Sequence, residues 1–165
     1  MIQLLPEHQE LCQKVIDLAI KRQVTIGTVE SCTGGMLGAW LTSISGSSAV
    51  FKGGLITYSN HLKTKLATVS PGLINEYGAV SGEVVLAMAE GGRAQLGTDI
   101  TIAISGIAGP QSDDSQKPVG LVHIAIYVGN EAIEQHRIFS GDRDEVRTNA
   151  CHFALNLCLK ILENN

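Results

Sequence analysis

Three short polar segments carry the side chains and glycines that could do chemistry in this sequence. Each directly follows an apolar run that predicts a strand, and the segments are residues 30–35 (ESCTGG), 58–63 (YSNHLK) and 105–110 (SGIAGP). In open α/β sheets, ligands bind at the carboxyl ends of the strands. If the three strands are parallel neighbours, the segments converge, and we expect the functional site where they meet.

The first segment has the design of an anion- or oxyanion-binding turn. Small polar residues precede Gly34 and Gly35 and then a predicted helix, and free N–H groups at a helix start attract negative charge. The spacing matches neither a P-loop nor a dinucleotide-binding fingerprint. One interpretation makes Ser31 a nucleophile, with the N–H groups near Thr33 and Gly34 as its oxyanion hole. In the other, Thr33 or Cys32 is only a helix cap.

The second segment offers a base, without which a serine hydroxyl is inert. Lys63 is predicted in or near the first turn of a helix, where the positive helix end lowers its pKa, and burial would lower it further. A neutral lysine can then accept a proton. Tyr58, at the strand end, could pass on a proton or hold the lysine. The alternative is a solvated Lys63 and a packed Tyr58.

The third segment offers Ser105 and Gly106 to bind polar groups of a substrate. Gly109 and Pro110 are typical of a turn. The polar stretch 111–117 that follows is long enough to move as a lid, and it reads equally well as an ordinary surface loop.

Several other polar residues have two interpretations. Cys32 is a rival nucleophile, because thiolates at helix N-termini are activated, or else a small buried thiol. His61 could face the site or the surface. Arg143 and Arg147 could reach an anionic substrate, but the sequence favours Asp142 as a helix cap with two solvated arginines.

Metal binding has little support in this sequence. The four cysteines form no CxxC pair and are interpreted as reduced thiols; they are Cys12, Cys32, Cys151 and Cys158. A zinc site is not expected from them. His123 alternates with apolar residues on a predicted buried strand, which favours a structural role.

The predicted elements alternate between strands and helices and end in a hairpin. Helices are expected over residues 7–22, 34–44, 60–69, 81–96 and 142–162, and strands over 24–29, 51–58, 99–105, 119–128 and 132–139. Ser70-Pro71-Gly72 is interpreted as the end of the third helix. This order predicts a single α/β domain over residues 1–165, with three α/β/α layers around a mixed, mainly parallel sheet.

Composition limits the partners and the location. The chain has 165 residues, 44% of them hydrophobic, and a net charge of −4, which argues against nucleic acid as the main partner. It contains no apolar run long enough for a membrane span, and the N-terminus lacks the pattern of a signal peptide. We therefore expect a cytoplasmic protein that binds neither membrane nor nucleic acid.

Six motifs in matching order make the sequence similar to the CinA C-terminal domain family over nearly its whole length. They are TVESCTGG (28–35), SGSSAVFKGGLITYSNHLK (45–63), GAVS (78–81), SGIAGP (105–110), KPVG (117–120) and FSGDRDEVR (139–147). The resemblance departs from the family pattern at residues 111–114 (QSDD), where members commonly have a glycine-rich stretch, and at Gly82, where a larger residue is expected.

The resemblance implies a nicotinamide-nucleotide amidase, which hydrolyses nicotinamide mononucleotide to nicotinate mononucleotide and ammonia in pyridine nucleotide salvage. It implies Ser31, Tyr58 and Lys63 as the catalytic residues, no metal or other cofactor, and a homo-oligomer. The longer members add an N-terminal domain for which this chain is too short. Two other hypotheses stay open: a nucleotide-binding regulatory module without turnover, and a thiol hydrolase that uses Cys32.

Overall fold

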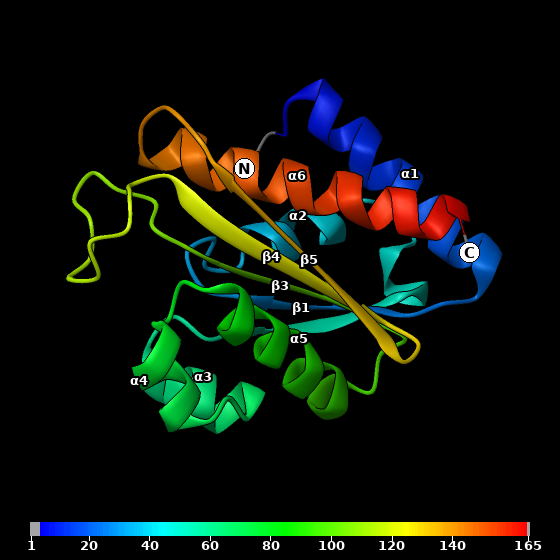
Figure 1. The fold of residues 1–165 in the computed structure, drawn as a ribbon. Helices are drawn as coiled ribbons and strands as arrows, with labels where there is room; N and C mark the ends of the chain where they lie inside the picture. Colours follow the sequence, from blue (N-terminus) through cyan, green and yellow to red (C-terminus); the bar gives the residue numbers. More distant parts are fainter. Residues whose placement is uncertain (1–3, 165) are drawn as a thin grey trace.

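A five-stranded mixed sheet forms the centre of the protein, in a computed structural model that describes residues 4–164 (Figure 1). Its strands are β1 (Ile26–Glu30), β2 (Phe51–Ile56), β3 (Ile100–Gly106), β4 (Leu121–Val128) and β5 (Glu131–Ile138). The helices are α1 (Pro6–Arg22), α2 (Met36–Thr42), α3 (Asn60–Ala67), α4 (Pro71–Tyr77), α5 (Gly82–Leu96) and α6 (Arg143–Asn164), with a 3₁₀ turn at Ser47–Ala49. The ends of the predicted domain, residues 1–3 and 165, lie outside the described residues.

The strand order is β2-β1-β3-β4-β5. β1 pairs in parallel with both β2 and β3, while β4 runs antiparallel to β3 and to β5. Only Gly129 and Asn130 separate β4 from β5, and so short a connection allows only a hairpin. The sheet is therefore mixed, with a parallel part that continues into the predicted hairpin.

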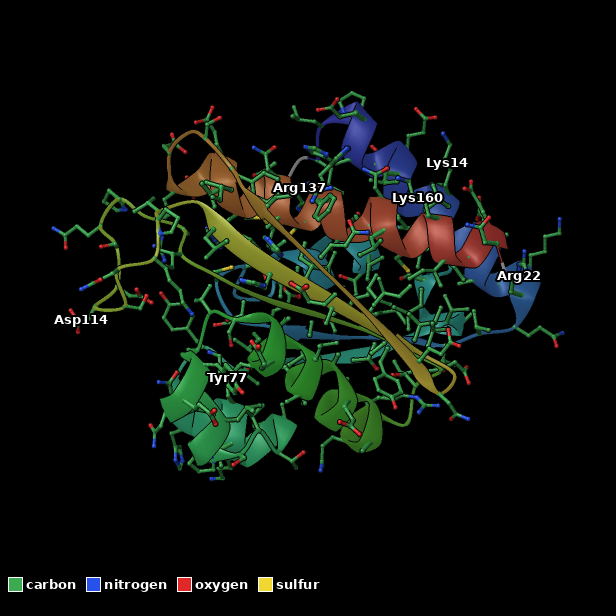
Figure 2. All side chains as sticks on the ribbon, in the orientation of Figure 1. Lys14, Arg22, Tyr77, Asp114, Arg137 and Lys160 are labelled. Carbon is green, nitrogen blue, oxygen red and sulfur yellow. The ribbon has the colours of Figure 1, made fainter. Side chains whose placement is uncertain are left out.

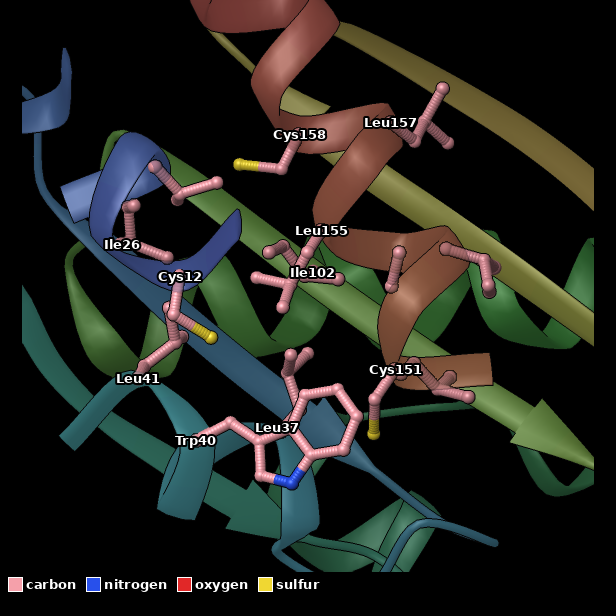
Figure 3. Close-up of a cluster of buried hydrophobic side chains, with 14 of the residues drawn as sticks. Cys12, Ile26, Leu37, Trp40, Leu41, Ile102, Cys151, Leu155, Leu157 and Cys158 are labelled. Carbon is pink, nitrogen blue, oxygen red and sulfur yellow. The ribbon is translucent and has the colours of Figure 1, made fainter. Parts of the chain in front are cut away.

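Helices cover both faces of this sheet, as the α/β/α prediction requires. Figure 1 shows α1, α2 and α6 on one side, with α3, α4 and α5 on the other. Each side has its own apolar core. Figure 3 shows the larger one, where Trp40 and Leu155 pack beside Cys12 and Cys151. Charged side chains project outward from the covering helices, among them Lys14 and Lys160 in Figure 2.

The register brings the carboxyl ends of the three parallel strands together. Glu30, the last residue of β1, pairs with Ile56 of β2 and Ile104 of β3. The ladder continues one step further, because the Ser31 N–H donates to the Ile104 carbonyl and the Thr57 N–H donates to the Glu30 carbonyl. The polar segments that follow β1, β2 and β3 therefore converge as the sequence predicts.

Two helix boundaries differ from the sequence prediction. Ser70-Pro71-Gly72 does not merely end a helix: Thr68, in the left-handed region with φ 55°, ends α3, and Pro71 opens the short helix α4. Proline suits a first helical position because the N–H that it lacks would have no partner there. α2 begins at Met36 because Gly34 and Gly35 both have positive φ.

The start of α6 follows the prediction more closely. The Asp142 N–H donates to Glu145 Oε2 at 2.7 Å, and the Glu145 N–H donates to Asp142 Oδ1 at 2.9 Å, which is a reciprocal capping box. Between β3 and β4, the polar loop extends away from the sheet, with Asp114 near its tip in Figure 2. Within residues 4–164, no helix combines the length and apolarity that a bilayer crossing needs.

Candidate active site

A cavity of about 530 Å³ lies at the carboxyl ends of β1, β2 and β3. Six of the nine predicted site residues line it: Ser31, Cys32, Tyr58, Lys63, Ser105 and Gly106. The polar loop after β3 and the start of α6 form further parts of its wall. The structure thus brings the three predicted segments to one hollow.

Lys63 and Ser31 form the central contact of this cavity. The Lys63 ammonium donates to Ser31 Oγ at 3.0 Å and to the Thr57 carbonyl at 2.9 Å, and the lysine is only 2% exposed. Ser59 caps α3 by accepting from the Leu62 N–H, which places Lys63 in the first turn, pointing back toward the strand ends. The solvated alternative for Lys63 is therefore wrong.

Burial lowers the pKa of the Lys63 ammonium from its ordinary value of 10.5 to about 8. No carboxylate within residues 4–164 forms an ion pair with Lys63 that would hold the proton in place. A useful fraction of Lys63 is consequently neutral near pH 8, and its lone pair can then accept the proton of the Ser31 hydroxyl. The geometry suits activation of a serine nucleophile.

The turn after Ser31 leaves two backbone N–H groups available. Within the described residues, the N–H groups of Cys32 and Thr33 donate to no other residue, although the Cys32 N–H contacts its own thiol, whereas the Gly34 N–H donates to the Ser31 carbonyl at 3.0 Å. Arg147 binds the Cys32 carbonyl through Nε and the Thr33 carbonyl through Nη2. In a trans peptide the N–H lies opposite the carbonyl, so the Thr33 N–H points away from Arg147.

The side chain of Glu30 occupies the start of α2, beside Gly34 and Gly35. Its buried carboxylate accepts hydrogen bonds from the Gly35, Leu37 and Gly38 N–H groups at 3.0, 3.1 and 2.8 Å, and thus caps α2. The helix N-terminus is therefore occupied by a protein carboxylate, and Thr33, Gly34 and Gly35 are not among the residues that line the cavity. The expectation of a free N–H at Gly34 is wrong, and the capping role of Glu30 was missed.

Tyr58 and Arg143 meet at the cavity wall. Tyr58 is 61% exposed, and its hydroxyl accepts from Arg143 Nη2 at 3.2 Å, while Arg143 Nη1 donates to the Gly109 carbonyl at 2.6 Å. Within the described chain, the Tyr58 hydroxyl makes no hydrogen bond to Ser31 or Lys63; only its backbone carbonyl lies near the lysine, at 3.5 Å. Solvated arginines were expected: Arg143 is indeed exposed, although it also binds the Gly109 carbonyl, whereas Arg147 is partly buried and binds the carbonyls of the first segment.

Ser105 and Gly106, the remaining predicted residues at the cavity, have structural contacts that shape its wall. The Ser105 hydroxyl donates to the Ala79 carbonyl at 2.7 Å, so it holds the segment before α5. Gly106 leaves no room for a side chain, since a Cβ there would lie 2.7 Å from Val122 Cγ2 and 2.9 Å from the Leu121 carbonyl oxygen. Lys117, which sequence reasoning did not single out, donates to the Tyr77 and Val80 carbonyls and holds the same segment.

Cys32 lines the cavity with a thiol that stays protonated. Burial raises its pKa to about 11, and the helix start that could have lowered it is already capped by Glu30. The four cysteines are unpaired and buried, and burial raises the pKa of Cys12 and Cys158 to about 12. A thiolate at Cys32 is therefore disfavoured near neutral pH.

Comparison with known proteins gives the family. The model of the CinA C-terminal domain matches residues 8–162, which is nearly the whole chain. The chain belongs to the CinA C-terminal domain family. This match confirms the resemblance carried by the six sequence motifs.

Curated relatives of this CinA-type domain are longer than the chain. A CinA-like protein from Geobacter sp. (strain M21) is 43% identical over 150 residues, covering 91% of this chain and 36% of the relative. Another from Parasynechococcus marenigrum (strain WH8102) is 51% identical over 133 residues, covering 81% of this chain and 32% of the relative. The chain thus spans about a third of the length of the curated relatives that it matches.

Solved structures of similar length share the fold. A competence-damaged protein (CinA) superfamily protein from Klebsiella pneumoniae has a TM-score of 0.94 at 32% identity, over 96% of this chain and 99% of that one. A competence/damage inducible protein from Agrobacterium tumefaciens has a TM-score of 0.92 at 34% identity, over 99% of both chains. These structures confirm the α/β architecture predicted from the sequence.

Proposed function

We propose that the protein is a nicotinamide-nucleotide amidase, which hydrolyses nicotinamide mononucleotide to nicotinate mononucleotide and ammonia. The observation that carries the proposal is the buried Lys63 Nζ, 3.0 Å from Ser31 Oγ at the wall of a cavity of about 530 Å³. Membership of the CinA C-terminal domain family, for which this activity is implied by the sequence resemblance, supports the choice of substrate.

The first half of the reaction would acylate Ser31. Neutral Lys63 takes the hydroxyl proton while Oγ attacks the carboxamide carbon, and the oxygen of the tetrahedral intermediate becomes negatively charged. The N–H group of Cys32, a residue that lines the cavity, is the backbone donor available to stabilise this oxyanion. The Lys63 ammonium then returns the proton to the amide nitrogen, the C–N bond breaks, and ammonia leaves behind an ester on Ser31.

The second half would hydrolyse that ester. Lys63, neutral again, takes a proton from water as the water oxygen attacks the ester carbon. Collapse of the intermediate breaks the bond to Ser31 Oγ, which recovers its proton from Lys63. Nicotinate mononucleotide is released, and the enzyme returns to its starting state without a metal or other cofactor.

Tyr58 and Arg143 would bind the charged end of the substrate. The Arg143 guanidinium is the cation at the cavity wall besides Lys63, and it is already oriented by Tyr58 and Gly109. Guanidinium groups bind phosphate through paired, charge-assisted hydrogen bonds. This assignment gives Tyr58 a positioning role through Arg143, in addition to the proton-transfer role that the family resemblance implies.

The protein would work in a reducing compartment and as a homo-oligomer. The four unpaired, buried cysteines support a cytoplasmic location, because disulfides form and persist in oxidising compartments. The oligomer is implied by the family resemblance, and light scattering on the purified chain would measure it. Nicotinamide mononucleotide would be the small-molecule partner, with neither nucleic acid nor membrane involved.

The deciding experiment is an ammonia assay with nicotinamide mononucleotide, run on the wild type, Ser31→Ala and Cys32→Ala. We expect ammonia from the wild type, with or without a chelator, and none above background from Ser31→Ala. If activity survives Ser31→Ala but not Cys32→Ala, the enzyme is a thiol hydrolase. If the nucleotide binds tightly and stays intact, the protein is a binding module. Loss of activity with chelator, while circular dichroism shows that the protein stays folded, would contradict the metal-free mechanism.

A further inference from the structure

Three side chains of the kinds that bind metals meet outside the candidate active site, on the β4–β5 hairpin. His123 of β4 and His136 of β5 flank Glu134, with the Nδ1 atoms of the two histidines 2.7 and 3.6 Å from Glu134 Oε1. One ligand atom from each residue lies within 4.8 Å of the other two. We refer to His123, Glu134 and His136 as the histidine–glutamate cluster.

The hairpin register places these side chains on one face of the sheet. His123 and His136 are direct cross-strand partners, and Glu134 precedes His136 by two residues. Successive side chains of a strand point to opposite faces, so residues two apart share a face. The shared face is the one covered by α5, because Ala125, two residues after His123, belongs to the apolar core on that side.

The first residue of α5 leaves space for this cluster. A Cβ at Gly82 would lie 3.3 Å from the Glu134 carboxyl carbon, so a larger side chain there would press on the glutamate. A glycine is unexpected at this helix start, since glycine has poor helix propensity. The space that Glu134 needs is a structural reason for a glycine at position 82.

The charge balance of the cluster is also unusual. The side chains of His123 and Glu134 are only 14% and 23% exposed, and within residues 4–164 the glutamate pairs with histidines alone, without lysine or arginine. A largely buried carboxylate needs a positive partner. A bound cation would supply it. His136, 61% exposed, leaves one side of the cluster open to solvent.

We propose that the histidine–glutamate cluster is a binding site for a divalent zinc ion. Two imidazoles and one carboxylate form a ligand set that zinc accepts, with water completing a tetrahedron. The ligand atoms are already close enough for small side-chain rotations to bring them onto one ion at about 2.0–2.2 Å. Zinc bound there would tie the edge hairpin together, beside the start of α5.

This site would be separate from the proposed amidase chemistry. None of its three residues lines the cavity that holds Ser31 and Lys63. The nearest link is the register pair of His123 with Ser105, whose hydroxyl holds the segment before α5. Zinc would therefore act on the rigidity of the fold, and no step of the proposed reaction passes through it.

The test is a zinc titration of the full chain, measured by isothermal titration calorimetry after a chelator has removed any bound metal. We expect one saturable site per chain. Glu134→Gln keeps the shape of the side chain, and His136→Ala changes an exposed residue, so both should fold, which circular dichroism would check. Each should weaken zinc binding by about 10-fold or more. His61→Ala, which removes an exposed histidine elsewhere, is the matched control and should bind zinc normally.

Diffraction at the zinc absorption edge on crystals grown with one equivalent of zinc would locate the ion. Density between the three side chains would support the site. The proposal is overturned if no saturable binding occurs at one equivalent, if both cluster variants bind zinc as tightly as the wild type, or if the ion lies elsewhere. None of these measurements depends on amidase turnover.

Discussion

The candidate active site joins residues that follow three different strands, whereas the histidine–glutamate cluster joins residues that face each other across one hairpin. In the first, a buried lysine without a carboxylate partner contacts a serine hydroxyl. In the second, a carboxylate contacts two histidines. The parallel strands β1, β2 and β3 end at the same edge of the sheet, so the polar segments that follow them meet there. The antiparallel strands β4 and β5 instead place polar side chains next to each other on one face of the sheet.

This difference teaches that the two regions should respond separately to substitution. In the cavity, burial lowers the pKa of Lys63. In the cluster, ligand atoms of three side chains lie close enough to share one metal ion. Changes at Ser31, Lys63 or Arg143 should therefore alter turnover and leave zinc binding intact. A change in zinc binding from a cavity variant would show that the two regions are coupled.

The largest expected effect comes from Ser31→Ala. Removing the proposed nucleophile should lower the proposed amidase activity by about 10⁴-fold or more, as losing a catalytic serine does in serine hydrolases. The measurement is ammonia release under saturating nicotinamide mononucleotide, with zinc stoichiometry measured on the same sample. Activity within tenfold of the wild type would exclude Ser31 as the nucleophile.

The next effect is that of Lys63→Met, which keeps the length of the side chain and removes the proposed base. General-base catalysis contributes about 10²–10⁴-fold, and we expect a loss of this size in kcat/KM. Lys65→Met is the matched control, because Lys65 is exposed on the same helix. Equal losses in both variants would mean that helix α3 is disturbed and that Lys63 has no special role.

Arg143→Ala should act on substrate binding more than on chemistry. A hydrogen bond to a charged group contributes about 1.5–3 kcal/mol, which corresponds to a rise in KM of roughly 10- to 100-fold with a smaller change in kcat. Arg22→Ala, at an exposed arginine at the end of α1, is the control. A fall in kcat at unchanged KM would place Arg143 in the chemical step instead.

The pH dependence follows from the pKa of Lys63. Activity as kcat/KM should rise with pH and level off above about 8, because the neutral amine is the base. Stability should rise over the range between about 8 and 10.5, since the unfolded chain binds more protons there than the folded one. The fall in pKa from 10.5 to about 8 corresponds to about 3 kcal/mol in the free energy of unfolding.

Lys63→Met tests both parts of this pH prediction. The variant should lose the rise in activity and also the rise in stability, which chemical unfolding at several pH values would measure. A wild-type profile without a transition near pH 8 would show that the lysine does not titrate there. A rise in stability that persists in the variant would assign it to other groups.

The smallest effect is expected for His61→Ala. His61 lies in the same sequence segment as Tyr58 and Lys63, but it is exposed and does not line the cavity. We expect kcat/KM to change by less than about 2-fold, because substitutions at exposed positions usually cost little. A larger loss would extend the active site to His61. It would also show that a residue of this segment can matter for activity without lining the cavity.

Local patterns were sufficient to predict most of the elements and the convergence of the three polar segments, whereas Ser31 and Lys63 were singled out among them by the family resemblance. Apolar runs and glycine positions indicate strands and turns, and the polar segments after them converge whenever the strands are parallel neighbours. Helix α4 was missed because Ser70-Pro71-Gly72 signals both the end of one helix and the start of the next. The capping of α2 by Glu30 was missed because a carboxylate before a turn has no distinctive spacing.

The sequence by itself determined the chemical groups, their order and the α/β fold, because these depend on residue types and short-range periodicity. Only the tertiary structure decided how deeply Lys63 is buried, that Arg143 reaches Tyr58 across 85 positions, and that His123 meets Glu134 on the next strand. Burial and long-range contacts depend on how whole elements pack. The pKa of Lys63 and the charge balance of the histidine–glutamate cluster are consequences of that packing.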